Sequence, residues 1–143
     1  MPITALANLE KIGQLKAEKP SSVEIERMLS LARQRLQDAS HPDLSLEGRF
    51  SSVYNAIHSA ALAALRWHGY RSENRYLVFQ SLQHTLQWPS AKWRVIDHAH
   101  RKRNLAEYEG FLEIEESSLE ELRKLAASLI EDVAQLTGSS TSN

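Results

Sequence analysis

The sequence predicts an all-α protein, folded as an antiparallel up-and-down bundle of four to six helices. Apolar residues recur at spacings of three and four through most of the 143 residues. No stretch alternates between apolar and polar residues with the period of two that marks a strand. Only five glycines and four prolines are available to interrupt helices. Helices joined by such short connections are expected to pack antiparallel to their neighbours.

The chain is predicted to form one bundle domain over residues 21–138, because its length suits a single domain. A short helix and linker over residues 1–20 precede this domain. Apolar residues fall at every third position from Ile3 to Leu15, and helix is disfavoured at the residue before Pro20. Residues 139–143 are predicted to be a disordered tail.

After this first segment, the sequence predicts two helices that each begin with a serine cap. Ser21 or Ser22 caps the first, which ends near Pro42. Ser45 caps the second, which covers about residues 46–70. The second half of this longer helix is rich in alanine and apolar nearly all round, so we expect it to lie at the centre of the bundle.

Three further helices are expected, at about residues 74–87, at about residues 91–107, and from Ser117 or Ser118 to Gly138. A Trp-Pro-Ser sequence at 88–90 separates the first two. Each of the two serines is followed three residues later by a glutamate, which is the spacing of a capping box. Gly110 marks the end of the middle helix, since glycine is common just past a helix C-terminus.

Composition excludes several classes of protein. The net charge of −1 argues against a generally basic nucleic-acid-binding protein, although a local basic patch is compatible with it. The absence of cysteine excludes disulfides and thiolate metal sites. No apolar run is long enough for a membrane span, and the N-terminus lacks the pattern of a signal peptide. We therefore expect a cytoplasmic protein without a membrane partner.

Neither a metal nor a cofactor is predicted. His98 and His100 are two residues apart, so on a helix they point about 160° from each other. His58 and His68 are ten residues apart, too far for one ion. The Glu-x-x-His pairs of di-iron bundles are absent from the sequence.

The candidate functional residues lie in the run 98–110. Four polar residues share an arc of about 100° on the predicted helix: His100, Arg103, Asn104 and Glu107. That arc overlaps the direction of Trp93 and Ile96, which begin the core stripe of the same helix, and Tyr108 lies about 40° beyond Asn104. A core stripe with a polar end indicates a cleft, an interface or a buried hydrogen-bonded network.

Two interpretations of this run stay open on spacing alone. In the first, Arg101 to Arg103 are solvated charges near a helix C-terminus, where cations are favoured, and Tyr108 buries its ring over the end of the bundle. In the second, Arg103 binds a phosphate with its fork of donors. Asn104 then orients Arg103, and a nearby side chain handles protons.

An Arg-Asn pair followed by a polar residue, between two helices of a small bundle, resembles the HEPN superfamily. The resemblance covers roughly Glu47 to Leu136. The hallmark of that family is an arginine, often followed by asparagine, and then four to six residues to a histidine. Arg103 and Asn104 match the first part of this pattern. Tyr108 stands where a four-residue spacer would place the histidine.

The resemblance implies one of two kinds of protein. Many HEPN proteins are metal-independent ribonucleases of toxin–antitoxin or phage-defence systems, and they commonly dimerise so that two motifs meet at one site. Many others have lost the catalytic pattern and act as binding or structural modules. By this resemblance we expect a homodimer. The expected partners are RNA or a nucleotide, and a cognate antitoxin or a nucleotidyltransferase-like protein.

The tyrosine is a departure from the family pattern. A tyrosine side chain has a pKa near 10, so it shuttles protons poorly at neutral pH compared with histidine. His100 shares a helical face with Arg103, but it precedes the arginine and does not restore the order of the motif.

Three functions therefore remain open. In the first, the protein is a dimeric ribonuclease in which Arg103 contacts the scissile phosphate, Asn104 positions Arg103, and His100 or Tyr108 assists. In the second, the same cluster binds a ligand or partner without chemistry, with further contacts from His100, Arg101 and Glu107. In the third, Arg103, Asn104 and Glu107 form a structural hydrogen-bond network. The sequence favours the second, a HEPN-like binding module.

Overall fold

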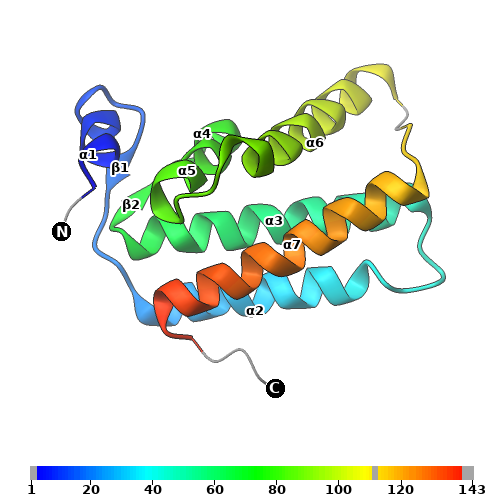
Figure 1. Cartoon of the computed structure of the whole chain (residues 1–143), viewed down its shortest axis with the longest axis horizontal. Helices are drawn as coiled ribbons and strands as arrows, with labels where there is room; N and C mark the ends of the chain where they lie inside the picture. Colours follow the sequence, from blue (N-terminus) through cyan, green and yellow to red (C-terminus); the bar gives the residue numbers. More distant parts are fainter. Residues whose placement is uncertain (1–2, 111–112, 140–143) are drawn as a thin grey trace.

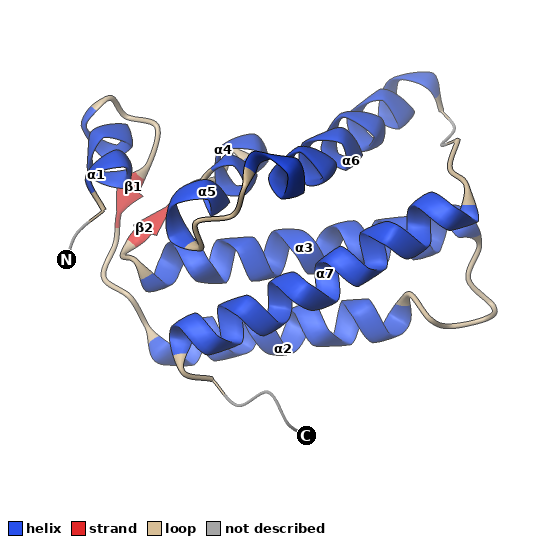
Figure 2. Ribbon diagram, viewed as in Figure 1, coloured by secondary structure: helices blue, strands red, loops and turns tan. Residues whose placement is uncertain are grey.

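The computed structural model describes residues 3–110 and 113–139, and most of them lie in helices, which confirms the all-α fold class (Figure 1). The helices are α1 (Thr4–Lys11), α2 (Ser22–Asp38), α3 (Leu46–Trp67), α4 (Arg75–Gln80), α5 (Leu82–Thr85), α6 (Ser90–Glu109) and α7 (Glu116–Thr137). Two short strands, β1 (Lys16–Ala17) and β2 (Tyr70–Arg71), pair near one end of the bundle, as Figure 2 shows.

Helix α3 occupies the centre of the molecule, as its alanine-rich sequence predicts. It packs against α2 and α7 on one side and against α4, α5 and α6 on the other (Figure 1). Ala60, Ala61, Ala63 and Ala64 are each no more than 1% exposed. Because alanine side chains are small, neighbouring helices approach α3 closely. The core is therefore built around this one helix.

Several predicted helix boundaries are confirmed. The side chains of Ser21 and Ser45 accept hydrogen bonds from the backbone N–H groups three residues on, at 3.3 and 3.0 Å. These bonds satisfy donors that have no partner within the helix. Gly110 and Gly138 follow α6 and α7 in the left-handed conformation, with φ of 81° and 73°. Glycine adopts this conformation without the steric penalty of a Cβ.

The predicted start of the last helix is wrong by two or three residues, because the capping position is Glu115 and not Ser117 or Ser118. Helix α7 begins at Glu116, and Glu115 occupies the capping position without a side-chain hydrogen bond. Ser117 and Ser118 therefore lie inside the first turn, and the capping box does not form. A carboxylate near a helix N-terminus interacts favourably with the helix dipole, which explains why this start needs no serine cap.

The helix expected over residues 74–87 is divided into α4 and α5. The division falls at Ser81, which is 1% exposed and whose hydroxyl donates a hydrogen bond of 2.7 Å to the carbonyl oxygen of Leu77. A serine bonded to the carbonyl four residues earlier often bends a helix. The division was not predicted, because a serine inside a periodic apolar pattern gives no clear signal of a helix break.

The first segment also differs from its prediction. Helix α1 ends at Lys11, and Gly13 turns the chain with a φ of 80°. The following residues form β1, in which Lys16 pairs with Arg71 and Ala17 pairs with Tyr70. Strands of two residues are too short to show the alternation by which a strand is predicted, so the sequence analysis expected none.

An ion-pair network around one buried arginine holds this N-terminal segment on the bundle. The side chain of Arg66 is 1% exposed. It donates hydrogen bonds to a carboxylate oxygen of Glu24 at 2.7 Å and to the carbonyl oxygens of Glu18 and Lys19 at 3.0 and 2.8 Å. Arg71 bridges the carboxylates of Glu18 and Glu24 from the other side, with distances of 3.1 and 2.7 Å. The network joins α3, α2 and the strand pair.

At the C-terminus, Ser139 still makes contacts with the bundle. Its hydroxyl donates to a carboxylate oxygen of Glu26 at 2.9 Å and lies 2.9 Å from the hydroxyl of Thr137. The rest of the predicted tail, residues 140–143, lies outside the described residues.

Candidate functional site

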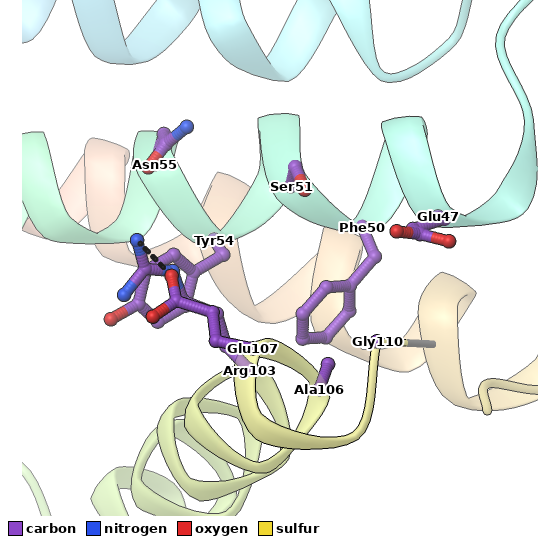
Figure 3. Close-up of a pocket in the computed structure, with 9 residues that line it drawn as sticks. All are labelled: Glu47, Phe50, Ser51, Tyr54, Asn55, Arg103, Ala106, Glu107 and Gly110. Atoms are coloured by element: carbon purple, nitrogen blue, oxygen red, sulfur yellow. Dashed lines mark ion pairs between the residues drawn. The ribbon is translucent and has the colours of Figure 1, made fainter. Parts of the chain in front are cut away.

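A cavity of about 370 Å³ lies between α3 and the C-terminal half of α6 (Figure 3). Helix α3 lines it with Glu47, Phe50, Ser51, Tyr54 and Asn55, and the α6 side lines it with Arg103, Ala106, Glu107 and Gly110. Cavities of a few hundred Å³ suit small ligands. This one contains Arg103 and Glu107, two of the residues that the sequence singled out.

Tyr54 is the best-anchored residue of the site. It is only 1% exposed, and its ring packs near Phe50 and Phe79, with centroid separations of 6.4 and 5.8 Å. Its hydroxyl group lies 2.8 Å from Nδ1 of His100. These contacts fix the position of the ring, so that it presents a rigid aromatic surface beside the cavity.

His100 connects this tyrosine to α6. Its Nδ1 forms a hydrogen bond with the hydroxyl group of Tyr54. Its Nε2 lies 3.3 Å from Nδ2 of Asn104, within hydrogen-bonding distance. Burial lowers the pKa of His100, nearby Asp97 opposes that shift, and the positive charge of Arg103 adds to it. The imidazole is therefore neutral at neutral pH. A neutral ring offers one donor and one acceptor, which matches its two partners.

Arg103 lies on the ring of Tyr54, with its guanidinium carbon 5.0 Å from the ring centroid. Its Nη2 forms an ion pair of 3.3 Å with Glu107, and the two side chains are 35% and 65% exposed. Ion pairs exposed to this degree contribute about 0–1 kcal/mol. The position of Arg103 thus depends on the Tyr54 ring as well as on the Glu107 carboxylate. The ion pair between Arg103 and Glu107 is weak enough for another anion to replace Glu107.

Two further residues lie beside this site without lining the cavity, and neither was predicted from the sequence. Arg75 of α4 places its guanidinium carbon 5.4 Å from the Tyr54 centroid. His58 of α3 contacts the edge of Phe79 at 5.9 Å, and burial lowers its pKa to about 4, helped by the charges of Arg75 and Arg103. His58 follows Tyr54 by four residues on one helical face, which is a usable signal, whereas nothing in the sequence marks Arg75.

The remaining predicted residues lie outside the cavity. Tyr108 is 94% exposed, so the alternative in which it buries its ring over the bundle is wrong. Tyr108 is five positions after Arg103, which rotates it by about 140° around the helix. Arg101 is 76% exposed and pairs with Asp97 at 3.2 Å. Asn104 reaches the site only through His100.

The structure thus brings together four of the six predicted residues, namely His100, Arg103, Asn104 and Glu107. Within the described ranges, no group of three or more histidine and carboxylate side chains is placed to hold a metal ion. None of the helices described there combines the length and apolarity needed to cross a membrane.

Comparisons of the chain with protein-family models, with curated proteins and with solved structures found no match. The class of this protein is therefore described by its fold and by the geometry of its candidate site. The chain is an all-α helical bundle with a small cavity, in which an arginine lies on a buried tyrosine.

Proposed function

We propose that the protein is a HEPN-like binding module whose cavity between α3 and α6 holds a phosphorylated ribonucleotide, either free or at the end of an RNA chain. One observation carries this proposal. The guanidinium of Arg103 lies at the cavity on the ring of Tyr54, and an exposed carboxylate is its only ion-pair partner among the described residues. A guanidinium fork matches the geometry of phosphate oxygens, and a phosphate would replace Glu107.

The other lining residues support a small ligand with polar and aromatic parts. Asn55 and Ser51 are exposed in the cavity and offer an amide and a hydroxyl for hydrogen bonds. Phe50 and Tyr54 line the cavity from its buried side. Glu47 and Glu107 at the same cavity would repel a long phosphate backbone, and the net charge of −1 attracts none. A single nucleotide therefore fits this site better than a duplex.

The resemblance to HEPN proteins adds the expected assembly to this proposal. In a homodimer, a second copy would bring a second Arg103 to a composite site. A cytoplasmic location and a cognate antitoxin or nucleotidyltransferase-like partner belong to the proposal through the same resemblance.

A metal-independent endoribonuclease is the second candidate, and His100 is the observation that favours it. This imidazole is neutral and lies less than one helical turn from Arg103. A neutral imidazole can take a proton from a ribose hydroxyl through its accepting nitrogen, and here Nε2 would exchange its hydrogen bond from Asn104 for one from that hydroxyl. Tyr108 does not take part in this version, because its side chain points into solvent.

The test measures binding of the four ribonucleoside 5′-monophosphates by calorimetry, with EDTA present. Wild type is compared with Arg103→Gln. Arg27→Gln is the matched control, because it removes the same charge from an exposed position on α2. We expect binding by wild type and control, and a loss of at least about tenfold in Arg103→Gln, the effect of about 1.4 kcal/mol. Equal binding by all three proteins, or none by wild type, would refute the proposal.

A cleavage assay on single-stranded RNA, under the same conditions, separates the two candidates. Intact RNA with bound nucleotide supports the binding module. Cleavage by wild type and by Arg27→Gln, but not by Arg103→Gln, would instead establish the nuclease. Circular dichroism of each variant checks that its helices are retained.

A further inference from the structure

Asn104 lies outside the cavity and is linked to it through His100 and Tyr54. It is exposed on α6, and its amide nitrogen Nδ2 lies 3.3 Å from Nε2 of His100, four residues earlier. An amide NH₂ group can only donate a hydrogen bond. Nε2 of His100 is therefore the acceptor in this contact and carries no proton.

The proton of His100 is then placed on the other ring nitrogen. Burial is the main cause that lowers the pKa of this imidazole, nearby Asp97 opposes the shift, and the charge of Arg103 adds to it, so the ring is neutral at neutral pH. A neutral imidazole carries one proton, and the hydrogen bond made by one nitrogen decides which nitrogen holds it. Nδ1 therefore donates to the hydroxyl oxygen of Tyr54, at 2.8 Å.

This arrangement leaves the hydroxyl hydrogen of Tyr54 without an acceptor. A tyrosine hydroxyl has one hydrogen to donate, while its oxygen accepts the bond from Nδ1. Tyr54 is 1% exposed, and its hydroxyl has no second hydrogen-bond partner among the described residues. Buried donors in native proteins nearly always have a partner, which can be a water or a bound ion. The hydroxyl can thus donate to a molecule in the cavity that Tyr54 lines.

Tyr54 and Arg103 lie together at this cavity. The guanidinium carbon of Arg103 is 5.0 Å from the centroid of the Tyr54 ring, and both side chains line the cavity (Figure 3). A phosphate held by Arg103 is therefore near the same ring, and its oxygens can accept the tyrosine O–H. With the proton of His100 on Nε2 instead, the O–H would be used on Nδ1. Only lone pairs of the tyrosine oxygen would then remain, and these repel phosphate oxygens.

We propose that Asn104 is a positioning residue of the ligand site, which acts by keeping the proton of His100 on Nδ1. The hydroxyl of Tyr54 is thereby free to donate to the phosphate that Arg103 binds. This inference rests on the proposed function. It makes Tyr54 a ligand-binding residue and gives a role to Asn104, which contacts no ligand itself. Because Asn104 engages Nε2, the nitrogen that a nuclease would need is occupied, which favours binding over cleavage.

The position of the proton is measured in the free protein by ¹⁵N NMR of the histidine rings, at about pH 8, where histidine is neutral. The signal of His100 is assigned by its loss in His100→Gln. We expect a protonated Nδ1 in wild type and in Asn104→Gln, which keeps the amide. Asn104→Asp should move the proton to Nε2, because a carboxylate only accepts hydrogen bonds. A proton on Nε2 in wild type would overturn the inference.

Binding of ribonucleoside 5′-monophosphates, measured by calorimetry, tests the role of the hydroxyl. Tyr54→Phe should weaken binding by about tenfold, because a hydrogen bond to a charged phosphate is lost while the ring stays. Asn104→Leu should weaken it by about threefold, because only part of the protein then carries the proton on Nδ1. Asn104→Gln should bind as wild type does. So should Asn8→Leu, which makes the same change at an exposed position on α1.

The double variant Tyr54→Phe/Asn104→Leu separates this role from a structural one. Without the hydroxyl, the position of the His100 proton no longer affects the ligand, so the double variant should bind as Tyr54→Phe does. Additive losses would show that Asn104 acts independently of Tyr54 and would overturn the inference, as would an unchanged affinity in Asn104→Leu. In these cases the proposed function would stand if Arg103→Gln still lost binding. No binding by wild type would overturn both.

Discussion

Arg66 and Arg103 carry the same guanidinium group in opposite surroundings. Arg66 is 1% exposed and satisfies its donors with two carboxylates and backbone carbonyls, whereas Arg103 is 35% exposed and pairs with a carboxylate that is itself mostly exposed. Removing one partner of a buried pair leaves an uncompensated charge, while an exposed pair is largely hydrated already. We therefore assign stability to the first arginine and binding to the second.

This assignment predicts a large difference between two matched substitutions. Arg66→Met should lower the free energy of unfolding by about 3 kcal/mol, because the carboxylate of Glu24 and the backbone carbonyls of Glu18 and Lys19 lose the donor that satisfies them. Arg103→Met should lower it by less than about 1 kcal/mol. Urea unfolding followed by circular dichroism measures both. Similar losses in the two variants would show that the site arginine is also structural.

His58 predicts a dependence of stability on pH. Its pKa in the folded protein is about 4, chiefly because of burial, against 6.5 as the ordinary value. The unfolded chain therefore binds a proton that the folded protein excludes between these two values. The contribution of neutral His58 is fully present above pH 6.5 and is lost as the pH falls toward 4. The full loss amounts to roughly 3 kcal/mol.

The measurement is the difference in unfolding free energy between pH 7 and pH 4.5, in wild type and in His58→Gln. The variant should lose less stability on acidification than wild type. His98→Gln, at an exposed position on α6, serves as the control and should behave as wild type. Identical pH profiles for wild type and His58→Gln would contradict the buried neutral state.

The sequence predicted part of the site for a clear reason. Helical geometry alone places His100, Arg103 and Glu107 on one face, and they do lie together. Their shared partner is Tyr54, which is 46 and 49 positions away from His100 and Arg103 along the chain. No local pattern reports contacts over such separations, so the position of this ring could be learned only from the fold.

At the scale of the helices, α3 and α7 begin in different ways. Ser45 caps α3 by accepting the N–H of Gly48 at 3.0 Å, whereas α7 begins at Glu116 without a side-chain cap. Periodicity predicted both helices, because it extends over many residues. The predicted start of α7 at Ser117 or Ser118 was wrong, because adjacent serines and glutamates offer several competing first turns.

A pair of serine substitutions tests this difference. Ser45→Ala should lower the free energy of unfolding by about 1 kcal/mol, since a backbone donor of α3 loses its acceptor. Ser117→Ala should change it by less than about 0.5 kcal/mol, because that serine lies within the helix and makes no cap. Chemical denaturation measures both, and a larger loss in Ser117→Ala would show that the capping box forms in solution.

Across the whole molecule, the cavity lies between a helix with many buried residues, α3, and a helix with few, α6. Helices α2, α3 and α7 share most of the buried residues, whereas α6 buries only Ile96 and Ala99. Its last two turns carry Arg103 and Glu107 and have no buried residue. Elements with few buried contacts open locally at low cost in free energy, so one wall of the cavity can adjust to a ligand.

Hydrogen exchange should reveal this contrast. The backbone amides of residues 53–65 in α3 should exchange slowest, near the limit set by global unfolding. Those of residues 103–109 in α6 should exchange much faster, and a bound nucleotide should slow them. Equal protection of the two segments in the free protein would show that α6 is packed as firmly as the core.

The central claim is that the cavity between α3 and α6 binds a phosphorylated ribonucleotide through Arg103. The most direct measurement is an NMR titration of the ¹⁵N-labelled protein with ribonucleoside 5′-monophosphates, following backbone amides and arginine side chains. The account predicts shifts at residues 51–55 and 103–107 and at the Arg103 side chain, with α2 unchanged. An unchanged spectrum, or shifts confined to other parts of the bundle, would contradict it.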